Sequence, residues 1–320
     1  MADYLPWREA MAQALYGPGG FYRDPAGPAA HFRTSAHASP LFAAALVQLA
    51  RRERLTTIVD IGAGRGELLA AIAAIDPGLH LVAVELTNRP DDLATAIEWR
   101  SDPPAGRTAA LVVANEWLDN VPLDVVEVAA DGRPRVVLVH PKTGEQVLGP
   151  EPAAADVRWL GRWWPLPGMP GYRAEIGHSR DEAWARLLRG LGPGSLAIAI
   201  DYGHALATRP AGGTLTGYRH GRQVVPIPDG SCDLTAHVAF DSLAVAARTV
   251  GAEPAQLRTQ RAALTELGLS GSRPPPADAE ADPRDYLSEL AHAGEAAELL
   301  DPAGLGGFGW LAVRVPRWPA

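Results

Sequence analysis

Cysteine and long apolar runs are almost absent from the sequence, and both absences exclude whole classes of protein. Cys232 stands alone among 320 residues, so the chain cannot form an internal disulfide, and no cysteine and histidine cluster has the spacing of zinc ligands. The longest apolar run, residues 41–50, is well short of the roughly 20 residues that a membrane-spanning helix needs. The first residues, MADYLPWREAMAQ, lack the apolar core of an export signal. We expect a cytoplasmic protein with no metal site and no membrane insertion.

Positive charge is also scarce. Lys and Arg number 29 against 37 Asp and Glu, which gives a formal net charge of −8, and the basic residues form no stripe that could neutralise a phosphate backbone. Nucleic acid is therefore not expected as a partner, whereas a basic protein segment is electrostatically acceptable. With 47% hydrophobic and 21% charged residues, the composition is that of an ordinary globular protein.

Continuous apolar runs alternate with helical patterns over much of the chain. Such runs are typical of parallel strands buried on both faces, and amphipathic helical patterns lie after the first run and before the fourth. The sequence therefore predicts an α/β fold with a doubly wound, Rossmann-like sheet. Further helical patterns lie near 239–250, 256–268 and 284–300, and GWLAVRVP (309–316) predicts a strand that closes the sheet. The four runs are TTIVDIG (56–62), HLVAVEL (80–86), AALVVANE (109–116) and SLAIAIDYG (195–203).

A hairpin interrupts this order. Two alternating runs flank an Asp-Gly pair in LDVVEVAADGRPRVVLVH (123–140), which is a hairpin signal, and a stretch rich in Pro and Trp follows to about residue 171. We therefore expect a single domain, 1–320, with an inserted β-hairpin region and extra helices. Its expected parts are an N-terminal lid segment (1–45), a cofactor-binding core (46–128 and 174–206), an insertion (129–173), and acceptor-side and C-terminal elements (207–320). The tryptophans of the insertion either compact a loop or form a partner surface.

Three glycines follow the first apolar run at every second position, in Asp60-Ile61-Gly62-Ala63-Gly64-Arg65-Gly66-Glu67. A dinucleotide-binding loop would place its third glycine one position later, where Glu67 stands. An acid at Asp60 would repel a pyrophosphate but can attract an ammonium or a sulfonium. The loop therefore favours a ligand with an amino-acid end, although the glycines could also form only a tight turn.

An acid ends the second run. Glu85 lies at the expected carboxyl end of that strand, where a carboxylate can accept hydrogen bonds from both ribose hydroxyls. The alternative is that Glu85 binds nothing and is only a solvated residue at the end of the strand. The loop and Glu85 match the first two motifs of class I S-adenosylmethionine-dependent methyltransferases, and this resemblance implies S-adenosylmethionine as the cofactor.

Polar residues also end the third run, in NEWLDN (115–120). Asn115 and Glu116 follow the strand directly and Asp119 lies three residues on, at the edge of the sheet where ligands of doubly wound folds bind. Carboxylates there suit a cationic methyl acceptor. The alternatives are that Asn115 caps a helix and that Asp119 is a solvated acid of its first turn.

Longer strings make the resemblance more specific. In order along the chain, ALYGPGGFYR, HFRTSAHASPLF, DIGAGRG, NEWLDNVPL, DYGH and DLTAHV follow the pattern of the MidA family, the mitochondrial complex I assembly-factor methyltransferases and their bacterial relatives. The resemblance covers nearly the whole chain. It implies a class I methyltransferase fold and methylation of an arginine on a protein or peptide partner, with a subunit of a respiratory complex as one candidate.

The same resemblance implies roles for single residues. Asp60, Gly62, Gly64, Gly66, Glu85 and Asn115 would bind the cofactor, and Tyr202, Asp233 and Thr235 would lie on the acceptor side near Asp201 and Gly203. Glu116 is the first candidate to contact the acceptor, and Asp119 and His237 are further catalytic candidates. His237 could be a base, because the ordinary pKa of histidine is near neutral pH, or a buried structural histidine.

One departure bears on the acceptor. Relatives carry a Pro-Glu pair within the segment that corresponds to TSAHAS (34–39), and His37 stands here in place of the acid. A methyltransferase of small molecules or peptides therefore stays open, as does an assembly factor that binds S-adenosylmethionine without methylating anything. A nicotinamide-dependent oxidoreductase is disfavoured by Glu67. The sequence leaves the oligomeric state open.

Overall fold

The main sheet of the computed structural model joins seven strands in the order β16-β17-β10-β5-β2-β3-β4, counted over the described residues, which are 3–23, 35, 39–103, 106 and 108–316. Its five strands from β10 to β4 run parallel, and the pair at the other edge is antiparallel. The predicted α/β class is confirmed, with the predicted C-terminal strand in the sheet. The bounds are Gln256–Thr259 (β16), Gly309–Arg314 (β17), Leu196–Asp201 (β10), Leu111–Asn115 (β5), Thr57–Ile61 (β2), His80–Val84 (β3) and Ile97–Arg100 (β4).

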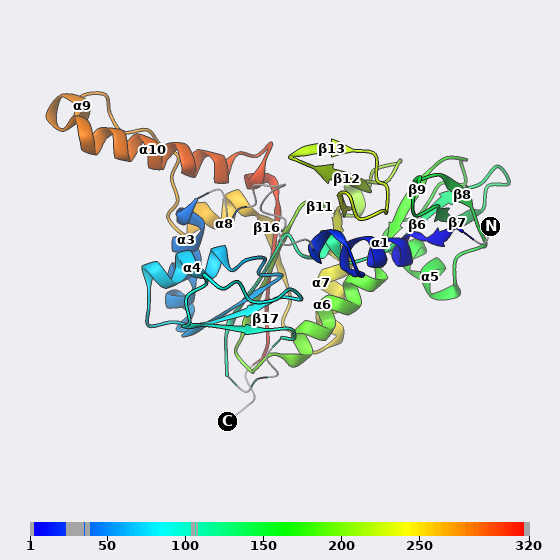
Figure 1. Cartoon of the computed structure of the whole chain (residues 1–320), viewed down its shortest axis with the longest axis horizontal. Helices are drawn as coiled ribbons and strands as arrows, with labels where there is room; N and C mark the ends of the chain where they lie inside the picture. Colours follow the sequence, from blue (N-terminus) through cyan, green and yellow to red (C-terminus); the bar gives the residue numbers. More distant parts are fainter. Residues whose placement is uncertain (1–2, 24–34, 36–38, 104–105, 107, 317–320) are drawn as a thin grey trace. The chain divides into compact units, whose positions relative to one another are not determined.

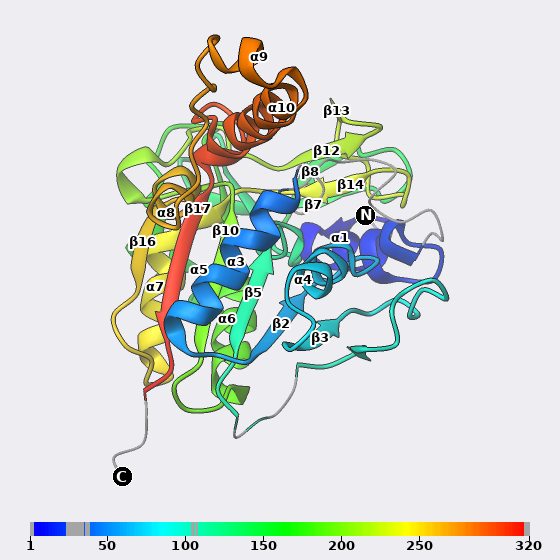
Figure 2. The same ribbon diagram turned by 90° about the vertical axis from the view of Figure 1, so that its left-hand side faces the viewer.

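This sheet belongs to the first of two compact units, made of Arg33–Asn115, Leu191–Ile200 and Gln256–Ala320 and called here the parallel unit. Figure 2 shows two of its helices, α3 and α4, on the same face of the sheet. Phe42 and Leu46 of α3 and Leu69 of α4 are fully buried in one apolar core with Ile58 of β2. The helices of this unit are α3 (Pro40–Glu53), α4 (Glu67–Ile75), α8 (Gln260–Glu266), α9 (Asp278–Ala281), α10 (Pro283–Leu300) and the 3-10 turn η5 (Leu305–Gly307).

One expected helix is partly wrong. The pattern over 256–268 predicted helix throughout, but Gln256–Thr259 is strand β16, which pairs antiparallel with β17. The helix α8 begins only at Gln260, because the hydroxyl of Thr259 accepts a hydrogen bond from the N–H of Ala262 and caps it. Pairing with a strand some 50 residues away overrides the local helical pattern.

The second unit, called here the antiparallel unit, consists of Met1–Phe32, Glu116–Gly190 and Asp201–Ala255. Figure 1 shows its short strands and helices in blue, green and yellow. In the described part of this unit the strands form three small sheets. The first joins β1 (Leu5–Pro6), β7 (Pro134–Val139), β6 (Asp124–Val128) and β9 (Arg173–Ile176), with β8 (Gln146–Leu148) on β7. The second pairs β11 (Gly203–His204) with β15 (Val238–Ala239), and the third joins β13 (Arg222–Val224), β12 (Thr216–Arg219) and β14 (Asp233–Thr235). Its helices are α1 (Trp7–Tyr16), α5 (Ala154–Trp163), α6 (His178–Gly190) and α7 (Phe240–Thr249), with the 3-10 turns η1 (Phe21–Arg23), η3 (Leu118–Asn120) and η4 (Leu206–Thr208).

The predicted hairpin is present in this unit. Strands β6 and β7 pair antiparallel, and Gly132 takes the left-handed φ of 78° that the connecting turn requires. Of the tryptophans that follow, Trp159 and Trp164 are buried in a core with Ile176 of β9. These two side chains compact the insertion, as one of the two interpretations of the sequence had it.

The boundaries of the two units differ from those of the segments expected from sequence. The expected lid segment 1–45 is divided, because Trp7 and Met11 of α1 pack in one core with Val125 and Val137, whereas α3 packs in the core of the parallel unit. The C-terminal elements divide at residue 255. The single-domain organisation stays a prediction. No helix among the described residues combines the length and the apolar character needed to cross a bilayer.

Candidate cofactor and acceptor sites

The glycine loop turns between β2 and α4 in the left-handed region of φ. The φ angles of Gly62, Gly64 and Gly66 are 72°, 58° and 86°, which only glycine adopts without strain. Gly66 is also the residue before the first turn of α4, and a Cβ there would lie 2.8 Å from a methyl carbon of Leu93. The alternating glycines predicted from sequence are therefore needed by the backbone.

Glu85 contacts this loop directly. One of its carboxylate oxygens accepts a hydrogen bond from the N–H of Gly64 at 3.0 Å, and the other accepts from the N–H groups of Leu86 and Thr87 at 2.7 and 3.2 Å. The main chain joins the same two segments, because the carbonyl oxygen of Val84 accepts a hydrogen bond from the N–H of Gly62 at 2.9 Å. The solvated strand end considered for Glu85 is wrong, because burial and these contacts fix its carboxylate against the loop. Burial raises its pKa above the ordinary value.

Asp60 and Asn115 complete this edge of the sheet. Asp60 is 5% exposed near the end of β2. Asn115 is the last residue of β5, and its neighbour Ala114 lies opposite Ile61, so Asn115 is level with the start of the glycine loop. Burial, with the nearby charges of Glu85 and Glu67, raises the pKa of Asp60 to about 8. All six residues predicted to bind a cofactor therefore lie at one edge of the parallel unit.

These residues fit S-adenosylmethionine. The carboxylate of Glu85 has about four lone-pair sites, of which backbone N–H groups use three, so it can still accept from a ribose hydroxyl. A buried acid beside two further acids is best compensated by a cation, and the cofactor carries an ammonium and a sulfonium. A pyrophosphate would instead add charge of the same sign to this cluster.

The residues predicted on the acceptor side lie in the antiparallel unit, beginning with Glu116. Its φ of 50° is unusual for a residue with a side chain and costs on the order of 1 kcal/mol or more. The turn after it is held by Asp201, whose carboxylate accepts hydrogen bonds from the N–H groups of Leu118 and Asp119, each at 3.1 Å. The backbone of Glu116 is therefore held in a strained form by a buried acid.

Asp119 faces inward. It is 3% exposed, and one of its oxygens accepts hydrogen bonds from the hydroxyls of Thr235, at 2.6 Å, and Tyr202. The solvated first-turn acid considered from sequence is therefore wrong. Its other oxygen is buried and has no hydrogen-bond partner among the described residues.

Asp233 belongs to a neighbouring set of contacts. One of its oxygens accepts from the hydroxyl of Tyr22 at 2.9 Å and from the side-chain amide of Asn120 at 2.9 Å. Burial and the charge of Asp119 raise the pKa of Asp233 to about 7. Asp119, Asp233 and Thr235 are thus brought together but enclosed, with Tyr202 beside them. His37 of the altered segment 34–39 lies outside the described residues.

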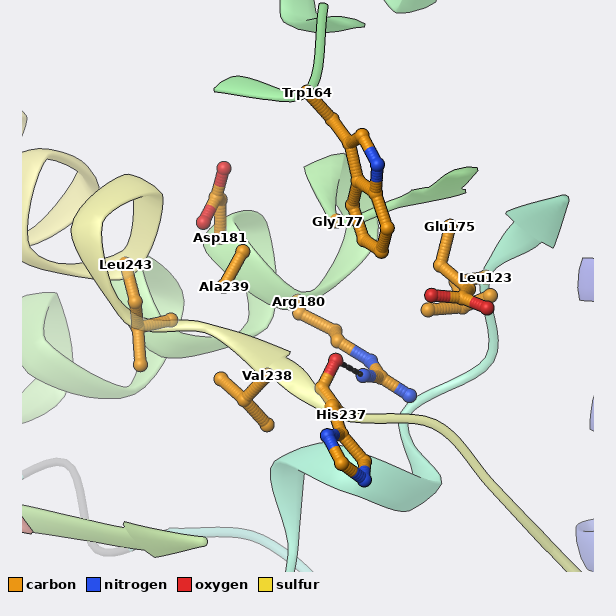
Figure 3. A pocket seen from close by; sticks show the side chains of 10 residues that line it. All are labelled: Leu123, Trp164, Glu175, Gly177, Arg180, Asp181, His237, Val238, Ala239 and Leu243. Carbon is orange, nitrogen blue, oxygen red and sulfur yellow. Dashed lines mark hydrogen bonds between the residues drawn. The ribbon is translucent and has the colours of Figure 1, made fainter. Parts of the chain in front are cut away.

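Sequence reasoning missed the residue at the centre of this network, Arg180 of α6. Its buried guanidinium donates hydrogen bonds to the carbonyl oxygens of Val121, Ala236, His237 and Asp119, three of them at 3.1, 2.7 and 3.0 Å in that order. Figure 3 shows it beside the carbonyl oxygen of His237, in a pocket that Glu175 and Trp164 also line. Arg180 therefore joins the loop after β5 to the segment around His237.

His237 itself is exposed, so the buried structural histidine is wrong. Its ring contacts the ring of Tyr202 edge-on, with 5.1 Å between centroids, and its backbone N–H donates to the hydroxyl of Thr214. Partial burial and the charge of Arg180 lower its pKa from the ordinary value, so the imidazole is neutral at pH 7.

The sheet order, the glycine loop and the acid after the next strand together define a class I methyltransferase fold. Residues 79–257 match a family model described as "Putative S-adenosyl-L-methionine-dependent methyltransferase", and the chain belongs to this family. The protein is an S-adenosylmethionine-dependent methyltransferase.

Two solved structures from Burkholderia thailandensis share the fold. One is bound to S-adenosyl-homocysteine and is 25% identical, with a TM-score of 0.78 over 98% of this chain and 88% of that chain. The other, an uncharacterised protein in its native form, is 26% identical with the same TM-score and the same coverage. No curated protein matches the chain.

The raised pKa of Asp60 predicts a pH-dependent affinity for S-adenosylmethionine. Below its pKa of about 8, Asp60 is protonated, and a cationic cofactor favours its ionised form, so binding releases a proton. We expect the Kd to fall as the pH rises from 5.5 to 7.5, by up to about tenfold per unit. Calorimetry in two buffers of different ionisation enthalpy measures both the Kd and the proton released. Asp60→Asn should flatten this slope, and an equally steep slope in that variant would contradict the assignment.

Proposed function

We propose that the chain is a MidA-type methyltransferase that N-methylates arginine on a protein partner. The observation that carries this proposal is Glu116, a non-glycine residue with a φ of 50° directly after the cofactor-side residue Asn115. Backbone strain of this kind persists where the surrounding structure enforces it, and it is concentrated at functional sites. Here Asp201 and Arg180 enforce it through the turn that follows.

The charge of the surroundings supports a cationic acceptor. Asp119, Asp201 and Glu175 are buried in the antiparallel unit, and Arg180 is the buried cation that their charges act on. Burial and the charges of Asp119 and Glu116 raise the pKa of Asp201 well above its ordinary value. A guanidinium would relieve this repulsion, whereas an anionic acceptor would add to it.

The chemistry assigns one task to each group. S-adenosylmethionine supplies the methyl group when it is bound; the S–CH₃ bond breaks as an N–CH₃ bond forms, and its electron pair stays on sulfur. The carboxylate of Glu116 accepts hydrogen bonds from the guanidinium and so orients one nitrogen toward the methyl group. That nitrogen loses one proton, which Glu116 accepts and passes to solvent. Arginine needs a carboxylate for this step, because its own pKa exceeds about 12.

Substitution of Glu116 tests the proposal. Glu116→Gln keeps the size of the side chain but removes the charge, so we expect methyl labelling of the acceptor to fall about 100-fold while S-adenosylmethionine binds within about twofold of the parent. The measurement is transfer of labelled methyl groups to proteins and metabolites of a deletion-strain lysate and to peptides of respiratory-complex subunits, with mass spectrometry of the product.

The matched control is Glu182→Gln, which changes an exposed acid on α6 of the same unit and should leave labelling unchanged. Label found only in small molecules would refute a protein acceptor. Full labelling of protein by Glu116→Gln would refute the role of Glu116.

A further inference from the structure

His204 lies next to the predicted site but has no role in the proposal above. The two-residue strand β11 pairs parallel with β15, which places Gly203 opposite Val238 and His204 opposite Ala239. The carbonyl oxygen of Tyr202 accepts from the N–H of Val238 at 3.0 Å. The ring of His204 lies 6.0 Å from that of His237 between centroids, and 4.8 Å from that of Trp164.

The protonation of His204 follows from its neighbour Arg209. The Nη1 of Arg209 lies 2.5 Å from Nδ1 of His204, and its Nη2 donates to the carboxylate of Asp241. A guanidinium can only donate, so Nδ1 must be the acceptor, and the single proton of the ring is on Nε2. Burial and the charge of Arg209 lower the pKa of His204 to about 3, and it stays neutral at physiological pH.

The Nε2–H group is then a buried donor that needs an acceptor. His204 is 8% exposed, and Nε2 has no hydrogen-bond partner among the described residues. A donor left in this state costs about 1–3 kcal/mol. Of the two rings beside it, the indole of Trp164 can only donate, whereas the imidazole of His237 has one nitrogen that accepts. His237 is exposed, so its ring is free to rotate toward His204.

We propose that Arg209, His204 and His237 form a one-way chain of hydrogen bonds that makes His237 a hydrogen-bond donor to the methyl acceptor rather than a base. The Nε2–H of His204 donates to one ring nitrogen of His237, so the proton of neutral His237 is on the other nitrogen, which faces the acceptor. His204 is therefore a positioning residue. This inference rests on the proposed function only where it places His237 at the acceptor.

The charges around these hydrogen-bonded side chains limit what His237 can bind. His237 lies near Arg180 and Asp119, and His204 lies near Arg209 and Asp241, so each ring has one cation and one acid near it and neither ring has a surplus charge that would select an ionic partner. A neutral oxygen is left as the partner of the outward N–H group. In a protein acceptor the abundant neutral oxygen is the peptide carbonyl, so His237 would fix the main chain beside the arginine.

Imidazole NMR of the full chain tests the inference without any acceptor or cofactor. In long-range ¹H–¹⁵N spectra between pH 5 and 8, we expect His204 to be neutral with its proton on Nε2 and His237 to show one dominant neutral tautomer. A ¹⁵N–¹⁵N coupling across the hydrogen bond should join the two rings. Resolved signals with no coupling and a free mixture of His237 tautomers would overturn the proposal, and would leave the Glu116 test unaffected.

Two substitutions separate a donor from a base. His204→Phe keeps the ring but removes the donor, so the pKa of His237 should rise by about 0.5 to 1 unit, whereas His292→Phe on α10 should not change it. Since a carboxamide donates but cannot serve as a base, whereas a leucine side chain does neither, His237→Gln should retain more labelling of the acceptor than His237→Leu does. An unchanged pKa in folded His204→Phe, or equal losses of labelling in His237→Gln and His237→Leu, would contradict the chain of hydrogen bonds.

Discussion

Replacement of Glu85 by alanine is expected to weaken the binding of S-adenosylmethionine about 100-fold. The variant loses the carboxylate that accepts from the N–H of Gly64 at 3.0 Å and that we predict to accept from the ribose. Hydrogen bonds to a charged group contribute about 1.5–3 kcal/mol each, and 100-fold corresponds to about 2.7 kcal/mol. Titration calorimetry of the purified full chain measures the change.

Two variants bracket this result. Glu85→Gln keeps the shape of the side chain and one acceptor oxygen but removes the charge, so its affinity for S-adenosylmethionine should fall about tenfold. The difference between Glu85→Ala and Glu85→Gln separates the effect of the charge from that of the shape. Glu98→Ala removes a partly exposed acid from the neighbouring strand β4, where it pairs with Arg100, and should bind as the parent does. Equal affinities for Glu85→Ala and Glu98→Ala would show that Glu85 does not contact the cofactor.

Arg180→Met is expected to give the largest loss of stability, about 3–5 kcal/mol in the free energy of unfolding. Methionine fills a similar volume but leaves four carbonyl oxygens without their donor and the charges of Asp119 and Asp201 without their buried cation. Such a loss lowers the Tm of a unit of this size by roughly 10 °C. Thermal and urea unfolding followed by circular dichroism test it.

Arg186→Met is the control, because it makes the same change at an exposed position on the same helix and should stay within about 0.5 kcal/mol of the parent. A similar small effect for Arg180→Met would mean that the guanidinium does not hold the loop after β5. The strained backbone of Glu116 would then need another explanation.

The cofactor edge could be predicted from sequence because its determinants are local. Gly62, Gly64 and Gly66 are needed by one turn of the backbone, and Glu85 follows at the end of the next strand, so spacing alone brings them together. That these strands are parallel and buried on both faces followed from their continuous apolar character, which is also a local property of the sequence.

The centre of the antiparallel unit could not be predicted in this way. Arg180 binds backbone carbonyl oxygens from two segments about 60 residues away in opposite directions, and a carbonyl oxygen has no signature in the sequence. His204 was visible in the string DYGH, but its protonation depends on the position of Arg209. For Asp119, a catalytic candidate, the sequence left a solvated acid open as the alternative, because its partners Tyr202 and Thr235 are distant in sequence.

The predicted start of a helix was wrong where pairing with a strand distant in sequence decided the structure. The four residues of β16 are too few to show a period of two, and they continue smoothly into the helical pattern of α8. Only the register with β17, which places Leu257 opposite Leu311, assigns them to the sheet.

The most direct test of the account is a calorimetric titration of the full chain with S-adenosylmethionine and, separately, with a nicotinamide dinucleotide. The glycine loop, Asp60 and Glu85 predict saturable binding of S-adenosylmethionine at one site per chain, with release of protons that depends on Asp60, and no binding of the dinucleotide. Tight binding of the dinucleotide with no heat from S-adenosylmethionine would contradict the central claim that this edge of the sheet holds a sulfonium nucleoside.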